Sequence, residues 1–228
     1  MIRYQGKQGC VVISLVILSQ PSISYQNLFI VVTRRYIYKS ATELSLTYHR
    51  SETISSHHEP QRKFVFLGRA ERRKGIIELN AVLKKLIADN KPFRFEFVGP
   101  IPPGNKIQHP SIIYHGEIRD TKKIKAILSR QDVLVCPSWS EGFPNVILEG
   151  MACGLAVIAT NVGAVAAMVS DKNGWLIEPA NKEQLEAALI HAIDSKELAS
   201  KKENSLQLVR TTFNWDRIAK KTIEAIRN

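Results

Sequence analysis

Two glutamates, Glu141 and Glu149, flank a turn and the start of an expected helix in the segment SEGFPNVILEGMACG, residues 140–154. Pro144 suits the first helical position, where its missing N–H costs no hydrogen bond, and Gly142 lets a ligand approach the backbone closely. The free amides and positive dipole end of such a helix attract phosphate or sugar oxygens. Glu149 follows about one and a half turns later, where a carboxylate accepts hydrogen bonds from vicinal hydroxyls, such as those of a ribose, and repels a phosphate.

A cationic turn, GRAERRKG at residues 68–75, is the second stretch whose residue types could do chemistry. It follows a strand-like segment and lacks the G-x-G-x-x-G pattern of dinucleotide-binding folds, which argues against a nicotinamide-dependent enzyme. Taken alone, Arg69 and Lys74, with Arg72 and Arg73 between them, are more typical of an ordinary solvated basic turn. Glu149 alone is likewise compatible with an ordinary surface position on a helix.

The elements that would position these residues alternate from residue 63 onward. Strands are expected at residues 63–68, 93–99, 111–118, 132–138, 155–163 and 174–179. Helices are expected at residues 74–90 and 121–131, after Pro144, near residues 165–169, at residues 181–198 with Asn181 as N-cap, and at residues 215–228. This alternation predicts an α/β fold, a Rossmann-like parallel sheet with helices on both faces and ligands at the carboxyl ends of the strands.

Residues 1–62 differ in character and are interpreted as a short partial α/β segment with a linker. A strand at residues 27–33, a helix at 34–46 and a polar linker at 51–63 are expected. The apolar run within residues 9–24 imitates a signal peptide, but it is too short to span a bilayer and a buried strand explains it more commonly. We therefore divide the chain at residue 62, with one full domain at residues 63–228.

The net charge of +11 is concentrated near the amino terminus. Residues 1–75 hold 12 Lys and Arg against 4 Asp and Glu, whereas residues 76–228 hold 20 against 17. A basic amino-terminal region suits an anionic partner, such as a membrane surface, a phosphorylated ligand or a nucleic acid. Alternatively, it is an ordinary solvated surface. Nucleic acid is disfavoured because no RNP, KH or zinc-finger spacing occurs.

The three cysteines, Cys10, Cys136 and Cys153, are odd in number and form no CxxC pattern. They are interpreted as reduced, buried thiols, which predicts a cytoplasmic protein, with peripheral contact to an anionic membrane left open.

In combination, these segments resemble the group 1, or family 4, glycosyltransferases, which are retaining enzymes of the GT-B fold. The family signature holds two glutamates separated by seven residues, here Glu141 and Glu149 within PSWSEGFPNVILEGMACGLAVIATNVG. Four further motifs follow the family order across residues 63–228: FLGRAERRKGIIEL, YHGEI, NGWLIEP and FNWDRIAKK. The resemblance implies that residues 63–228 are the carboxy-terminal, nucleotide-sugar-binding half of such an enzyme.

The resemblance also implies roles for individual residues. Arg69 and Lys74 hold the donor diphosphate and, with Glu141, form the catalytic set, because two cations stabilise the negative charge of the departing nucleoside diphosphate. Glu149 binds the ribose. The implied donor-binding set is Gly68, Arg69, Lys74, Gly116, Glu141, Gly142, Phe143, Pro144, Asn145 and Glu149. No metal or other cofactor is implied, no Asp-x-Asp pair occurs, and the choice among UDP, GDP and ADP sugars stays open.

Two departures from the family pattern leave the function between two alternatives. The sequence GAVAAMV carries Ala164 and Ala167 where members commonly have the second Gly and the Glu of Gly-Gly-x-x-Glu, and only about sixty residues precede the donor domain. One alternative is a transferase that passes a sugar to a saccharide or lipid-linked acceptor with the help of an acceptor-domain partner chain or a second copy. The other is a non-catalytic nucleotide-sugar-binding or interaction module, an inactive truncated remnant.

Overall fold

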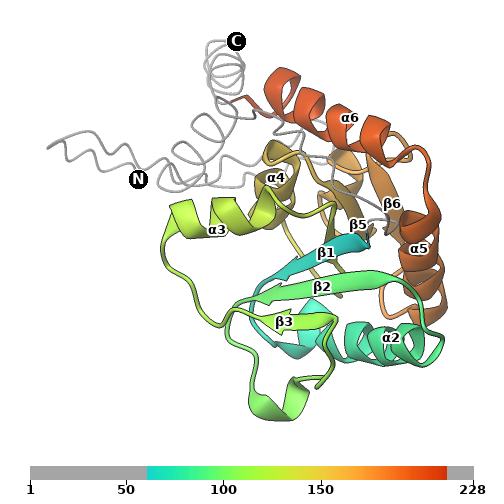
Figure 1. Cartoon of the computed structure of the whole chain (residues 1–228). Coiled ribbons are helices and arrows are strands. Elements are labelled where there is room, and N and C mark those ends of the chain that lie inside the picture. The colour runs from blue at the N-terminus through green and yellow to red at the C-terminus, as the bar shows by residue number, and fades with distance from the viewer. Residues whose placement is uncertain (1–60, 215–228) are drawn as a thin grey trace, which may run out of the picture.

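The computed structural model describes residues 61–214, which form one parallel sheet of six strands in the order β3-β2-β1-β4-β5-β6 (Figure 1). The strands are β1 (Arg62–Leu67), β2 (Phe93–Val98), β3 (Ile112–Tyr114), β4 (Val133–Cys136), β5 (Ala156–Thr160) and β6 (Gly174–Ile177). This order confirms the predicted Rossmann-like sheet. The predicted partial α/β segment, the predicted helix at residues 215–228 and Cys10 lie outside the described residues.

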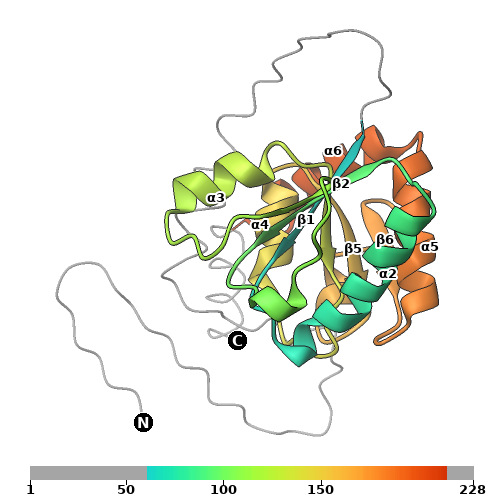
Figure 2. The same cartoon turned by 60° about the horizontal axis from the view of Figure 1, so that its bottom comes forward.

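Helices cover both faces of the sheet, as predicted (Figure 2). One face packs against α2 (Ile76–Ala88) and α5 (Lys182–Asp194), and the other packs against α3 (Thr121–Leu128), α4 (Asn145–Ala152) and α6 (Leu198–Thr211). Three short 3₁₀ helices complete the elements: η2 (Arg72–Lys74), η3 (Pro103–Asn105) and η4 (Val165–Ala167). Successive strand residues alternate between the two cores, so Phe64 and Phe66 face α2 and α5 while Val65 faces the other side.

Phenylalanines of β1 and β2 fix the part of the sheet nearest the cationic turn. The ring centroids of Phe64 and Phe95 lie 6.2 Å apart in a stacked arrangement, and those of Phe95 and Phe97 lie 4.8 Å apart. Each fully buried ring contributes roughly 1.5–3 kcal/mol relative to exposure. The strands that deliver the loops at residues 68–75 and 99–102 are therefore held in a rigid layer.

The predicted helix at residues 181–198 is wrong at its carboxyl end, because α5 stops at Asp194 and a separate helix, α6, follows it. Ser195 adopts an extended conformation with ψ 121°. Arg62 on β1 donates from Nε to the carbonyl of Ile193 and from Nη2 to the carbonyl of Ser195, each at 3.1 Å. These bonds satisfy carbonyls at the helix end, where no intrahelical partner remains.

Other predicted boundaries hold or move slightly. The Asn181 side chain caps α5 by accepting a hydrogen bond from the amide of Gln184 at 2.8 Å, as predicted. The strand expected at residues 111–118 shortens to β3, and β1 begins at Arg62, one residue before the predicted division of the chain.

Cys136 and Cys153 are buried free thiols, as predicted for this part of the chain. Burial raises the pKa of Cys153 to about 12, which keeps the thiol protonated at neutral pH. Within residues 61–214, no helix combines the length and the apolar character that crossing a bilayer would need.

Candidate functional site

The loops that follow β1 and β4 meet at the point where the strand order reverses, which is where open α/β sheets hold their ligands. β1 and β4 are parallel neighbours in the sheet. The loop after β1 contains Arg73 and Lys74, and the loop after β4 contains Trp139 and Glu141. The backbone amide of Trp139 donates to the carbonyl of Arg73 at 2.7 Å, which ties the two loops together.

An ion pair between Lys74 and Glu141 lies at the centre of this junction. The Lys74 Nζ atom is 2.5 Å from Glu141 Oε1, although the two residues are 67 positions apart in the chain. Both side chains are mostly buried, with 18% and 10% of their surfaces exposed. Arg73 Nη1 approaches the other carboxylate oxygen of Glu141 at 3.9 Å. The structure thus brings two predicted site residues into direct contact. It also places Arg73 beside them, although the sequence analysis did not select Arg73 as a site residue.

Gly75 allows the two loops to approach so closely. Its φ of +69° is a left-handed conformation, and a Cβ atom at this position would lie 1.9 Å from the carbonyl oxygen of Pro137. Only glycine fits such a contact without a shift of the backbone. The position of Lys74 beside Glu141 therefore depends on a glycine that our sequence interpretation did not select.

The helix expected after the Gly-Phe-Pro turn is α4, and it begins one residue later than predicted. Pro144 is the N-cap residue, with φ −75° and ψ 98°, and Asn145 is the first helical residue. No side chain caps the first turn. The amide of Ala164 donates to the carbonyl of Gly142 at 2.9 Å. Since this contact uses the backbone of residue 164, an alanine there still supports the turn.

Glu149 lies on α4 in a half-buried position. Burial raises the pKa of its carboxyl group above the ordinary value. Within residues 61–214, no side chain or amide forms a hydrogen bond or an ion pair with this carboxylate. The carboxylate is therefore available to accept hydrogen bonds from a ligand.

Glycines follow three neighbouring strands, because Gly68 and Gly99 come directly after β1 and β2, and Gly116 lies two residues after β3. The amide of Gly68 donates to Val98 at 2.9 Å, and the amide of Gly99 donates to Gly116 at 2.8 Å. A Cβ atom on Gly99 would lie 1.9 Å from the carbonyl oxygen of Gly68. Gly99 was missed by our prediction, although the pattern aromatic-x-Gly recurs in FLG, FVG and YHG at the three strand ends and could have revealed it.

Arg69 and Phe143, two further predicted site residues, form no hydrogen bond, ion pair or ring contact with the Lys74–Glu141 pair among residues 61–214. The Arg69 side chain is 76% exposed, and its Nη1 atom lies 3.6 Å from Glu71 Oε1. Phe143 packs edge-on against Phe213, with ring centroids 6.3 Å apart. The Arg72 guanidinium lies 3.8 Å from the ring centroid of Trp139. Such contacts anchor the two loops to the domain and to each other.

The sheet order, the two helical layers and the paired loops define this domain as the carboxy-terminal half of a GT-B fold. Residues 61–195 match the family described as glycosyl transferases group 1. This match covers more than half of the chain, and the chain belongs to that family.

Known proteins agree with this membership. TuaC of Bacillus subtilis, a glycosyltransferase named for teichuronic acid biosynthesis, is 33% identical over 129 residues, which are 57% of this chain and 32% of TuaC. The carboxy-terminal domain of the group 1 glycosyl transferase LpcC from Francisella tularensis superposes with a TM-score of 0.60 at 26% identity, over 68% of this chain and 87% of that domain.

Anabaena HepE, solved in complex with UDP, has a TM-score of 0.62 at 20% identity, over 73% of this chain and 49% of HepE, which shows the shared fold. The chain spans less than half the length of the curated relatives it matches.

Proposed function

We propose that residues 63–228 form the donor-binding half of a retaining glycosyltransferase, which takes a nucleotide sugar and passes the sugar to a saccharide or lipid-linked acceptor. The contact between Lys74 and Glu141 carries this proposal. It places a cation and a carboxylate side by side at the carboxyl edge of the sheet, next to the uncapped start of α4.

The chemistry of this junction suits a nucleoside diphosphate as leaving group. The Lys74 ammonium has three N–H donors, of which Glu141 needs only one, so a diphosphate can share the cation with that carboxylate. Arg69 and the first-turn amides of α4 supply further positive charge from two sides. Positive groups fixed before the reaction stabilise the charge that develops when the glycosidic bond to the diphosphate breaks.

Glu149 suits the ribose of the same donor. Its half-buried carboxylate has acceptor capacity that the described residues leave unused, and two vicinal hydroxyls would donate to it. Glu141 and the backbone of residues 142–145 are then left for the transferred sugar and the distal phosphate, with Gly68 and Gly116 beside the nucleoside. HepE, which has the same fold, was solved with UDP and with UDP-glucose, and this agrees with a nucleotide sugar as the donor class.

Titration calorimetry of the full chain against UDP-glucose, GDP-mannose and ADP-glucose tests the donor class. We expect one nucleotide to bind and Lys74→Ala to weaken its nucleoside diphosphate by about tenfold to a hundredfold, because a hydrogen bond to a charged group contributes roughly 1.5–3 kcal/mol. The nucleoside itself should bind unchanged. Arg69→Ala should act in the same direction.

Matched controls are Lys84→Ala and Arg210→Ala, which remove exposed cations of α2 and α6. Neither should change the affinity for any of these ligands. Equal losses for the nucleoside and the nucleoside diphosphate in Lys74→Ala would contradict the assignment of Lys74 to phosphate.

A further inference from the structure

One face of β2 carries two charged side chains, where most of the sheet carries apolar ones. The sequence of β2 is FRFEFV, in which Phe93, Phe95 and Phe97 face the core under α2 and α5, while Arg94 and Glu96 alternate onto the opposite face. An internal strand of a parallel sheet that is covered on both sides usually reads as a continuous apolar run. The alternation therefore indicates that this face of β2 is not covered by an apolar core.

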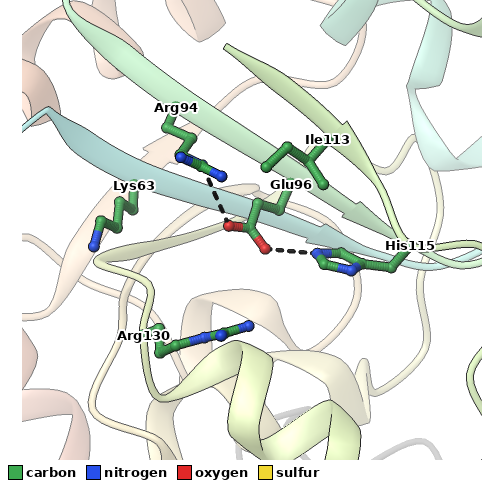
Figure 3. A pocket seen from close by; sticks show the side chains of 6 residues that line it. All are labelled: Lys63, Arg94, Glu96, Ile113, His115 and Arg130. Carbon is green, nitrogen blue, oxygen red and sulfur yellow. Dashed lines mark hydrogen bonds and ion pairs between the residues drawn. The ribbon is translucent and has the colours of Figure 1, made fainter. Parts of the chain in front are cut away.

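A cavity of about 360 Å³ lies on this face (Figure 3). Its lining consists of Lys63, Arg94, Glu96, Ile113, His115 and Arg130. The volume falls within the range of about 300–1,000 Å³ that is typical of small-molecule sites. Only Ile113 is apolar and no Phe, Tyr or Trp takes part, so a ligand here would be recognised by charge and hydrogen bonds rather than by stacking.

Glu96 lies at the centre of the cavity with 9% of its side chain exposed. Its Oε2 atom is 2.6 Å from His115 Nε2, whereas Oε1 is 3.7 Å from Arg94 Nε, too far for a hydrogen bond. Burial by itself raises the pKa of Glu96, but His115 and the nearby Gln131 amide lower it, and the net pKa lies below the ordinary value. Glu96 is therefore a carboxylate at neutral pH, and Arg94 does not hydrogen-bond to it.

Gln131 lies buried beside Glu96, with 2% of its surface exposed. Its side-chain amide is one of the groups that lower the pKa of Glu96. Gln131 therefore helps to keep Glu96 in its charged form.

Three permanent cations surround the single carboxylate. Lys63 Nζ and the Arg130 guanidinium form no ion pair or hydrogen bond with residues 61–214, and Arg94 has only its long contact with Glu96. Figure 3 shows Arg94 and Arg130 on opposite sides of the Glu96 carboxylate. The cavity has a net positive charge, which attracts anions, and the two guanidinium groups match the geometry of a phosphate.

The cations of the cavity lie away from the proposed donor site, although His115 at its other end adjoins Gly116 of the donor set. Lys63 and Arg94 are register partners, and each precedes the last residue of its strand, Leu67 or Val98, by four positions. At 3.3 Å per residue this places them about 13 Å from the carboxyl edge where Lys74 meets Glu141.

We propose that this cavity is a second ligand site, which binds a small phosphorylated sugar. The phosphate lies among Lys63, Arg94 and Arg130, and sugar hydroxyls donate to Glu96. A bare phosphate fits less well, because Glu96 would repel it at close range while accepting a hydroxyl in the same place. The site is independent of the donor function proposed above.

Titration calorimetry of the full chain with glucose 6-phosphate, inorganic phosphate and glucose tests this proposal. We expect glucose 6-phosphate to bind at least about tenfold more tightly than either of the other two probes. Arg130 is exposed, and the Arg130→Ala substitution should lower the affinity for glucose 6-phosphate by about tenfold to a hundredfold. Lys84→Ala and Lys74→Ala should leave it unchanged, and a saturating nucleoside diphosphate should not compete.

Three results would overturn the proposal: no binding of glucose 6-phosphate at millimolar concentration, equal affinity for inorganic phosphate, or a loss of binding in Lys74→Ala but not in Arg130→Ala. The last result would place the phosphate in the donor site. Binding of glucose 6-phosphate by a chain that binds no nucleotide would uphold this inference while refuting the donor proposal.

Discussion

Glu96, Glu141 and Glu149 are wholly or partly buried, and they differ in what compensates their charge. Glu141 pairs with Lys74, and Glu96 pairs with His115. Glu149 has neither an ion pair nor a hydrogen bond among residues 61–214, and burial raises its pKa. An ionised Glu149 therefore costs folding free energy, which we propose that ribose hydroxyls offset on binding.

We expect Glu149→Gln to increase the free energy of unfolding at pH 7, because the neutral amide avoids the cost of burying a charge. The pKa of Glu149 is higher in the folded state than in the unfolded state. The ionised carboxylate therefore destabilises the folded protein at pH values above its folded pKa. This destabilisation disappears as the pH falls through that value toward the ordinary pKa of 4.5. Urea unfolding at pH 7 and at pH 4.5 should show the difference between the two proteins narrowing at the lower pH.

The same substitution should lower the affinity for the nucleoside by about tenfold to a hundredfold, because a charged hydrogen-bond acceptor is lost. Glu203→Gln, an exposed position on α6, serves as the control for both measurements. A Glu149→Gln protein that is less stable yet binds the nucleoside normally would assign Glu149 a purely structural role.

At the level of elements, the site depends on how closely the loop after β1 meets the loop after β4. Gly75 ends η2, precedes α2 and lies against Pro137. This single contact fixes the entry of α2 and the position of Lys74 together. The stability of the domain and the geometry of the site are therefore coupled at Gly75.

We expect Gly75→Ala to lower the free energy of unfolding by about 1–2 kcal/mol from the left-handed conformation alone, and further from the clash with the Pro137 carbonyl. Donor affinity should fall as well, because the loop must move. Urea denaturation measures the first effect. Gly104→Ala is the matched control, since Gly104 has no positive φ and no atom within 4 Å of an added Cβ. Equal stability of the two variants would contradict the role given to Gly75.

At the level of the whole molecule, the chain spans less than half the length of the curated relatives it matches. The proposed donor ligands lie between Gly68 and Glu149 at one edge of one sheet. A transferase must also hold the acceptor hydroxyl in line with the donor, and such positioning contributes about 7–11 kcal/mol to lowering the barrier. We propose that an acceptor-binding domain supplies it.

We therefore expect the purified chain to bind its nucleotide sugar without sustained transfer. Incubation with radiolabelled donor and with saccharide and lipid-linked acceptors measures transfer, and calorimetry on the same preparation measures binding. Multiple turnovers by the chain alone would refute the need for a partner. Binding without transfer in the presence of an acceptor-binding domain would instead favour the non-catalytic module.

The sequence by itself determined the order of the six strands, the parallel sheet and the start of α4 to within one residue, but it did not predict α6. These features depend on side-chain periodicity and on turn residues such as Gly142 and Pro144, which act on their neighbours in the chain. The donor-site residues were selected through the family motifs, and the structure shows where they lie without testing their roles.

Only the tertiary structure decided which of these residues meet. The Lys74–Glu141 pair joins positions 67 apart, and the break between α5 and α6 depends on Arg62, which is 131 positions from Ile193. The charged cavity depends on a face of the sheet that its helices leave uncovered. Such contacts are set by strand order and register, because packing brings together residues whose separation along the chain carries no local signal.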